Sequence, residues 1–197
     1  MKYPDFFNNI EPIKLKDELS SFLGTFEDGE VEFTYLEVAK TAGHSCPTVA
    51  GAYLMTREAL KVLFDGSTPK RGEIVVEFKE DMEEGVAGVI ANVISNITGA
   101  TTTTGFKGLG GRFSRCDLMF FNCEIDSNVR FSTVDSKKSV DVYYDPSLIK
   151  PDPKQSELMN KIMHGQGSKD DMREFGILWQ KRVEEIFLNS DKVITIK

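Results

Sequence analysis

The sequence predicts an α+β fold, in which a mainly antiparallel sheet packs against helices, with additional helices towards the N- and C-terminal ends. Apolar residues recur at helical spacing in several segments and alternate with polar residues in several others. These segments follow the order helix, strand, helix, strand, helix, strands, helices. Short connections separate the later strands, which indicates antiparallel hairpins.

The first part of the chain is expected to contain one helix, one strand and a short helical segment. Apolar residues over 15–26 recur at helical spacing and predict an amphipathic helix, which Gly29 ends. Alternation over residues 31–35 predicts a short strand. Residues 36–41 follow as one or two helical turns.

A long helix is predicted over residues 47–64. Pro47 suits its first position, because proline has no N–H to leave without a partner there. Cys46 is then the predicted N-cap. The small residues at 50–52 would allow another element to pack closely against this helix.

The rest of the chain is predicted to form a strand, a helix, three strands, two helices and a closing edge strand. In order, the ranges are 72–79, 86–97, 113–125, 129–133, 140–144, 156–163, 170–188 and 193–196. Gly99 is expected to end the helix over residues 86–97, and a polar loop at 101–105 follows it.

Length, charge and cysteine content narrow the class of protein. A chain of 197 residues fits one domain over residues 1–197, with residues 151–190 as a C-terminal helical extension. The formal net charge of −7 argues against a general nucleic-acid binder. No apolar run reaches membrane-spanning length, and the first residues lack a signal-peptide pattern, so we expect a cytoplasmic protein without a membrane partner. Three cysteines without regular spacing do not suggest a disulfide framework.

The most informative motif is His44-Ser45-Cys46, which places an imidazole and a thiol two residues apart before the long helix. A thiol at a helix N-cap faces the positive end of the helix dipole, which favours its thiolate. Imidazole nitrogen and thiolate sulfur are ligands that zinc and related ions accept. His44 and Cys46 are therefore predicted as metal ligands and as catalytic residues. The alternative is a structural pair, in which the cysteine caps the helix and the histidine bonds to the backbone.

A third metal ligand is expected from the predicted strand over residues 113–125. Cys116 and Cys123 both lie on it, and their odd spacing places them on opposite faces, so that at most one can reach the motif. Cys116 is the preferred ligand because it lies close to two arginines, in the more polar setting.

A glycine-rich segment at residues 105–112 is the second candidate site. Its four glycines allow a ligand to approach the backbone closely, and nearby cations could hold a phosphate or a carboxylate. The segment matches neither a phosphate-binding loop nor a dinucleotide-binding fingerprint. The residues predicted to bind a small anionic molecule are Lys107, Gly108, Gly110, Gly111, Arg112 and Arg115. The alternative is a tightly turning loop before a strand.

Two of these segments carry a resemblance to a known family. His44-x-Cys46 with its following proline and small-residue helix is similar to the His-x-Cys-Pro segment of the FmdE family, the E-type component of the tungsten and molybdenum formylmethanofuran dehydrogenases. Thr98-Gly99, with the glycine-rich loop after it, resembles the second signature of that family. The similar core covers residues 35–145.

The resemblance implies an α+β core, a homodimer and a metal site that includes His44 and Cys46. A transition metal ion is the implied cofactor, with zinc favoured by the donor atoms. Two features differ from the family. Ala100 stands where many members have a cysteine, and the C-terminal part lacks the zinc-ribbon tail that some members carry. The site is therefore reduced or completed differently.

Three functions are consistent with the sequence. The leading one is a metal-binding protein with an open coordination position, whose glycine-rich loop holds the anionic end of a small substrate. The second is a metal-free acyl-transfer enzyme with Cys46 as nucleophile and His44 as base. The third is a non-catalytic accessory or scaffold protein, in which the motif holds the structure together.

Overall fold

The structure is a computed structural model that describes residues 1–135 and 137–197. Its helices are α1 (Glu18–Phe22), α2 (Tyr35–Ala42), α3 (Pro47–Phe64), α4 (Ala87–Thr98), α5 (Pro153–Met163), α6 (Lys169–Leu188) and α7 (Ser190–Val193), with 3-10 turns η1 (Asp5–Asn9), η2 (Glu27–Gly29) and η3 (Pro146–Leu148). Its strands are β1 (Ile13–Lys16), β2 (Glu30–Phe33), β3 (Ile74–Phe78), β4 (Met119–Phe120), β5 (Val129–Thr133), β6 (Ser139–Tyr144) and β7 (Ile194–Ile196).

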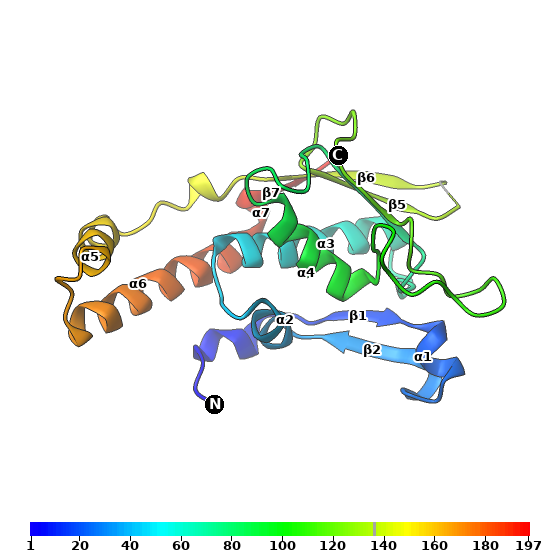
Figure 1. Ribbon diagram of the computed structural model, residues 1–197, viewed down its shortest axis with the longest axis horizontal. Coiled ribbons are helices and arrows are strands. Elements are labelled where there is room, and N and C mark those ends of the chain that lie inside the picture. Colours follow the sequence, from blue (N-terminus) through cyan, green and yellow to red (C-terminus); the bar gives the residue numbers. More distant parts are fainter. Residues whose placement is uncertain (136) are drawn as a thin grey trace.

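The elements form three layers (Figure 1). A five-stranded sheet of order β4-β3-β5-β6-β7 lies on one side, α3 and α4 lie in the middle, and the β1–β2 hairpin lies on the other side. In the large sheet β3 and β4 are parallel, whereas the other described neighbours are antiparallel. The predicted α+β fold with a mainly antiparallel sheet and additional terminal helices is therefore confirmed.

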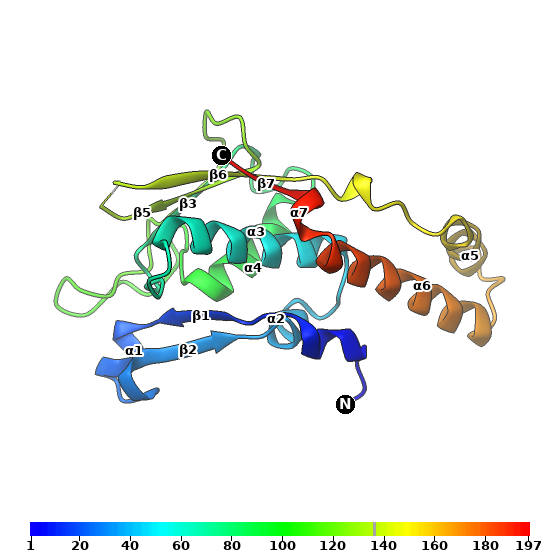
Figure 2. The same ribbon diagram turned by 180° about the vertical axis from the view of Figure 1, so that it is seen from behind.

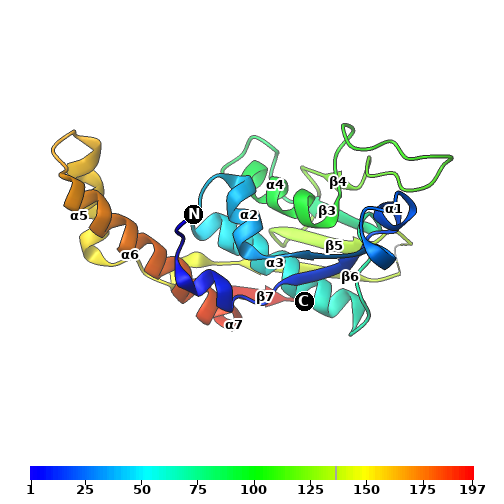
Figure 3. The ribbon, with the colours of Figure 1, turned by 90° about the horizontal axis from the view of Figure 1, so that it is seen from below.

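The helices α5 and α6 extend from this layered body as an arm. Figure 2 shows the arm from behind, and Figure 3 shows from below how far α5 lies from the sheet. One part of α6 packs on α3, while α5 packs on α6. Within the described ranges, no helix is both long enough and apolar enough to cross a membrane.

The central helix α3 begins and ends at the predicted residues and supplies much of the core. Tyr53 and Leu54 are fully buried. The hydroxyl of Tyr53 lies 2.9 Å from the carbonyl oxygen of Phe33, which ties α3 to the β1–β2 hairpin. On its other side α3 packs against β6. Gly51 lies against the ring of Tyr144 there, so the predicted role of the small residues in close packing is confirmed for this position.

The predicted helix over residues 15–26 is wrong in extent. Leu15 belongs to β1, where it pairs with Val31 of β2, and it is almost fully buried. Only Glu18–Phe22 is α-helical. The aromatic residues Phe22 and Phe26 are exposed, so the apolar spacing here is not a core-facing stripe.

The predicted long strand over residues 113–125 is also wrong, because only Met119–Phe120 is paired in a sheet. Three residues of this segment have positive φ angles, which an extended strand does not allow: Phe113 at 65°, Asp117 at 58° and Asn122 at 55°. The other expected strands and helices exist, with small shifts at their ends, and β7 forms the expected edge strand.

Gly51 and Gly176 give a matched test of the packing of α3 on β6. A Cβ atom at Gly51 would overlap the ring of Tyr144, whereas a Cβ atom at Gly176 in α6 would meet nothing within 4 Å. Gly51→Ala is expected to lower the free energy of unfolding by about 2 kcal/mol through overpacking. Gly176→Ala is expected to raise it by about 0.5 kcal/mol, because alanine is the better helix former.

Urea denaturation of the two variants beside the wild type measures both changes. If Gly51→Ala were as stable as Gly176→Ala, the close approach of Tyr144 to α3 would be incorrect.

Candidate functional site

The motif lies in the short connection between α2 and α3. The helix α2 ends at Gly43, whose left-handed backbone, with φ of 77°, turns the chain. Pro47 then occupies the first position of α3, as predicted. Residues 44–46 are therefore held between two helix ends.

Cys46 is the N-cap of α3, as predicted. Its Sγ atom accepts a hydrogen bond from the backbone N–H of Val49 at 3.4 Å. Only 9% of the residue is exposed, and it belongs to the hydrophobic core. The sulfur thus lies at the N-terminal end of an 18-residue helix, in contact with the first-turn backbone.

His44 is exposed, and its ring is oriented by the backbone. The Nδ1 atom lies 3.0 Å from the carbonyl oxygen of Ala42. A carbonyl oxygen only accepts, so this contact requires a proton on Nδ1. In the neutral ring Nε2 then carries the free lone pair, which is the arrangement that both metal-binding and proton-accepting histidines use.

Side chains from two other elements hold the main chain of the motif. The carbonyl oxygen of Ser45 accepts hydrogen bonds from Trp179 Nε1 at 3.0 Å and from Gln180 Nε2 at 3.1 Å, both on α6. The hydroxyl of Tyr144, in β6, donates to the carbonyl oxygen of Pro47 at 2.6 Å. The peptide group that precedes Cys46 and the one that follows Pro47 are therefore fixed by tertiary contacts.

Tyr35 adds a contact to the side chain of Ser45, with the two hydroxyl oxygens 2.8 Å apart. Burial raises the pKa of Tyr35 and also that of Tyr144 above the usual value for tyrosine. Both phenols therefore stay protonated at neutral pH and can act as hydrogen-bond donors beside the motif.

Sequence reasoning missed this group of supporting residues. The sequence by itself assigns no role beside the motif to Trp179 or Tyr144. The bonded partners are 97 to 135 residues apart in the chain, except for the Tyr35–Ser45 pair. No local pattern signals a contact over such a separation.

The structure does not bring Cys116 to the motif as a third ligand. Across residues 1–135 and 137–197, no three His, Cys, Asp or Glu side chains gather closely enough to hold a metal ion. Cys116 lies in the loop before β4, where its Sγ atom donates to the carbonyl oxygen of Gly105 at 3.0 Å. Neither Cys116 nor Cys123 lies in a strand, so the prediction that they occupy opposite faces of one strand is wrong.

The glycine-rich segment forms a tight hairpin. Leu109 and Arg112 exchange two backbone hydrogen bonds, of 2.9 and 3.0 Å. Gly110 and Gly111 between them have φ angles of 55° and 78°, which a two-residue turn with both central residues left-handed requires. These glycines therefore serve the turn, which is the alternative that the sequence left open. Lys107 remains exposed on the same loop.

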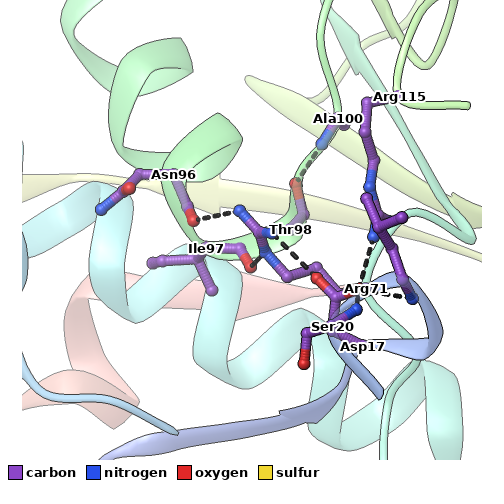
Figure 4. A network of polar contacts seen from close by, with 9 residues as sticks. Asp17, Ser20, Arg71, Asn96, Ile97, Thr98, Ala100 and Arg115 are labelled. Carbon is purple, nitrogen blue, oxygen red and sulfur yellow. Dashed lines mark hydrogen bonds and ion pairs between the residues drawn. The ribbon is translucent and has the colours of Figure 1, made fainter. Parts of the chain in front are cut away.

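Arg115 differs most from its predicted role in anion binding. It is only 6% exposed, and its guanidinium bonds to the Asp17 carboxylate at 2.8 Å. Arg71 bonds to the same carboxylate at 3.0 Å and also donates to the carbonyl oxygens of Asn96 and Ile97 at the end of α4 (Figure 4). Arg115 is thus almost fully buried and bonds to a carboxylate of the protein, which is a structural role that sequence reasoning did not assign to it.

A hollow of about 470 Å³ opens beside His44. It lies between the N-terminal segment, α2 and the motif, and it is lined by Met1, Lys2, Tyr3, Pro4, Phe7, Leu36, Ala39, Lys40, Gly43, His44, Ser45 and Gln180. Its volume falls in the range of small-molecule sites. His44 lines this hollow and can therefore contact a molecule bound in it.

The chain matches no protein-family model and no curated protein in sequence. The features that bear on function are therefore the motif, its supporting contacts and the adjacent hollow.

The ion cluster of Asp17 gives a testable prediction for stability. Burial alone raises the pKa of Asp17, but the hydrogen bond from Arg71 and the charge of Arg115 outweigh it, and the net pKa is below the usual value. Asp17→Asn keeps an oxygen that can cap α1 but leaves Arg115 buried without its charge partner. We expect the free energy of unfolding at pH 7 to fall by about 3 kcal/mol.

The sign of the pH dependence follows from the lowered pKa. The wild type keeps the stabilising charge above the ordinary carboxyl pKa of about 4 and loses it as the pH falls through the folded-state value. The difference between Asp17→Asn and the wild type should therefore shrink in acid, as measured by urea denaturation at several pH values. Glu32→Gln, which breaks an exposed pair with Lys14, is the control and should cost less than about 1 kcal/mol. An equal effect of both variants would contradict the role of the cluster.

Proposed function

We propose that this chain is a metal-binding protein of the FmdE type, the E-type component of formylmethanofuran dehydrogenase, in which His44 and Cys46 supply two ligands. The observation that carries the proposal is the set of tertiary hydrogen bonds that fix the motif from α2, β6 and α6. A connection that serves only as a link between helices does not need such support. Ligand residues that must hold a fixed geometry do need it.

The donor set supports a transition metal, with zinc favoured. The His44 ring, whose Nδ1 atom bonds to a backbone carbonyl, and the Cys46 sulfur at a helix N-terminus are both of the residue types that ordinarily bind zinc. The described part of the chain offers no third such side chain beside them. We therefore expect the remaining positions to be filled by another molecule, either a second copy of the chain in a homodimer or water and substrate.

Such a site has a direct chemical use. A metal ion with an open position polarises a bound water or a substrate carbonyl group. The hollow beside His44 would admit a small substrate to that position. Tyr35 and Tyr144, as neutral donors, would keep the motif in place during binding.

Elemental analysis of protein purified without a tag or a chelator tests the proposal. We expect about one equivalent of zinc or a related ion per site in the wild type, and its loss in Cys46→Ser and His44→Gln. Serine is a preferred N-cap, so Cys46→Ser should keep α3 intact and the melting temperature close to that of the metal-free wild type.

Cys123→Ser is the matched control and should retain the metal, and so should Cys116→Ser if the third ligand comes from another molecule. Absence of metal from the wild type, or full retention in Cys46→Ser, would refute the proposal.

A second candidate is supported by the contact between Cys46 Sγ and the N-terminus of α3. A thiolate held there, with His44 as base, could act as the nucleophile in an acyl transfer without a metal. In that case the Cys46 sulfur attacks the acyl carbon, and His44 passes the thiol proton to the leaving group. Water later hydrolyses the resulting thioester, which releases the acid and restores the thiol.

Thiol reactivity separates this candidate from the first. Cys46 is the only one of the three cysteines that is buried, so exposure alone predicts that it reacts slowest. A nucleophilic Cys46 would instead react first with iodoacetamide in chelator-treated protein, followed by peptide mass mapping, and His44→Gln would slow it. Faster modification of Cys116 and Cys123 would exclude this candidate.

A further inference from the structure

The hollow beside His44 is lined by cationic and apolar residues, although the chain as a whole is acidic. The chain carries a net charge of −7, yet none of the residues that line the hollow is Asp or Glu. Two lysines, Lys2 and Lys40, line it. Neither forms an ion pair with any residue in the part of the chain that the structure describes. The hollow therefore offers positive charge that no side chain neutralises.

The remaining walls of the hollow are largely apolar. Phe7 and Ala39 are buried core residues, and Leu36 packs against the same core. Tyr3 and Pro4 add further apolar surface from the N-terminal segment. An apolar lining with a few cations is typical of sites that bind amphipathic small molecules. Inorganic phosphate would leave this apolar surface in contact with water.

One side of the hollow belongs to the proposed reactive motif. His44 and Ser45 both line it. Gln180, which donates to the Ser45 carbonyl oxygen, lines it as well, and its Oε1 atom is buried without a hydrogen-bond partner in the described structure. A buried acceptor of this kind is commonly satisfied by water, and a carboxylate, which only accepts hydrogen bonds, leaves that place to water.

We propose that the hollow binds a small carboxylic acid with an aromatic or branched aliphatic body, whose carboxylate is neutralised by Lys2 and Lys40. The body of the acid lies on Phe7, Leu36 and Ala39, on the side of the hollow that His44 also lines. This inference rests on the proposed function, because it assigns the substrate class of the same site. It also replaces the glycine-rich loop as the place where the anionic end is held.

Isothermal titration calorimetry with benzoate, 3-methylbutanoate and the uncharged benzamide tests the proposal. We expect benzoate and 3-methylbutanoate to bind and benzamide to bind at least about fivefold more weakly. Lys40→Gln and Lys2→Gln should each weaken benzoate binding about fivefold and leave benzamide unchanged. Both lysines are exposed, so these variants should fold like the wild type.

Lys107→Gln is the matched control, because it removes an exposed lysine from the glycine-rich loop. It should leave benzoate affinity unchanged. Equal affinity for benzoate and benzamide, no binding of either acid, or a loss of binding in Lys107→Gln but not in Lys40→Gln would overturn the proposal.

The same titration in Cys46→Ser separates this inference from the metal proposal. Benzoate binding that persists in Cys46→Ser and is lost in Lys40→Gln supports the hollow whether or not the wild type holds a metal. Metal content is read independently by elemental analysis. A wild type that contains metal but binds neither acid would overturn only the substrate class.

Discussion

The pairing of Asp17 with Arg71 and Arg115 is the interaction on which the arrangement of the other elements depends. It joins the start of α1 to segments that lie 54 and 98 residues further along the chain. Arg71 extends the cluster to the last carbonyl groups of α4, so one carboxylate fixes the hairpin layer against the central helices (Figure 4). Removing one partner would leave a charge inside the protein, which is far more costly than losing an exposed ion pair.

The position of α3 between the two β-layers determines where the site lies. One face of α3 meets the β1–β2 hairpin through Tyr53, and another meets β6 through Gly51 and Tyr144. The contact that packs Tyr144 onto the helix also brings its hydroxyl to Pro47 at the helix start. Tyr144 thus links the packing of α3 on β6 to the start of the helix that Cys46 caps.

The candidate site combines a local part with a long-range part. The cap at Cys46, the turn at Gly43 and the orientation of His44 all arise from contacts within a few residues. Spacing and helix chemistry could therefore predict them from the sequence. The hollow and its two lysines arise where the N-terminal segment and α2 meet, and sequence reasoning did not single out this place. The glycine-rich loop has a backbone reason for its glycines, because the turn at Gly110 and Gly111 needs positive φ angles.

The sequence by itself determined the fold class, the order of most elements, both ends of α3 and the cap at Cys46. These depend on hydrophobic periodicity and on helix-end chemistry, which act over a few residues. Only the tertiary structure decided that residues 113–125 are mostly irregular, that Arg115 is buried with Asp17, and that α6 and β6 supply the donors which hold the motif. The reason is physical: burial, ion pairing and hydrogen bonding between distant segments depend on where the chain returns in space, and no short pattern in the sequence records that position.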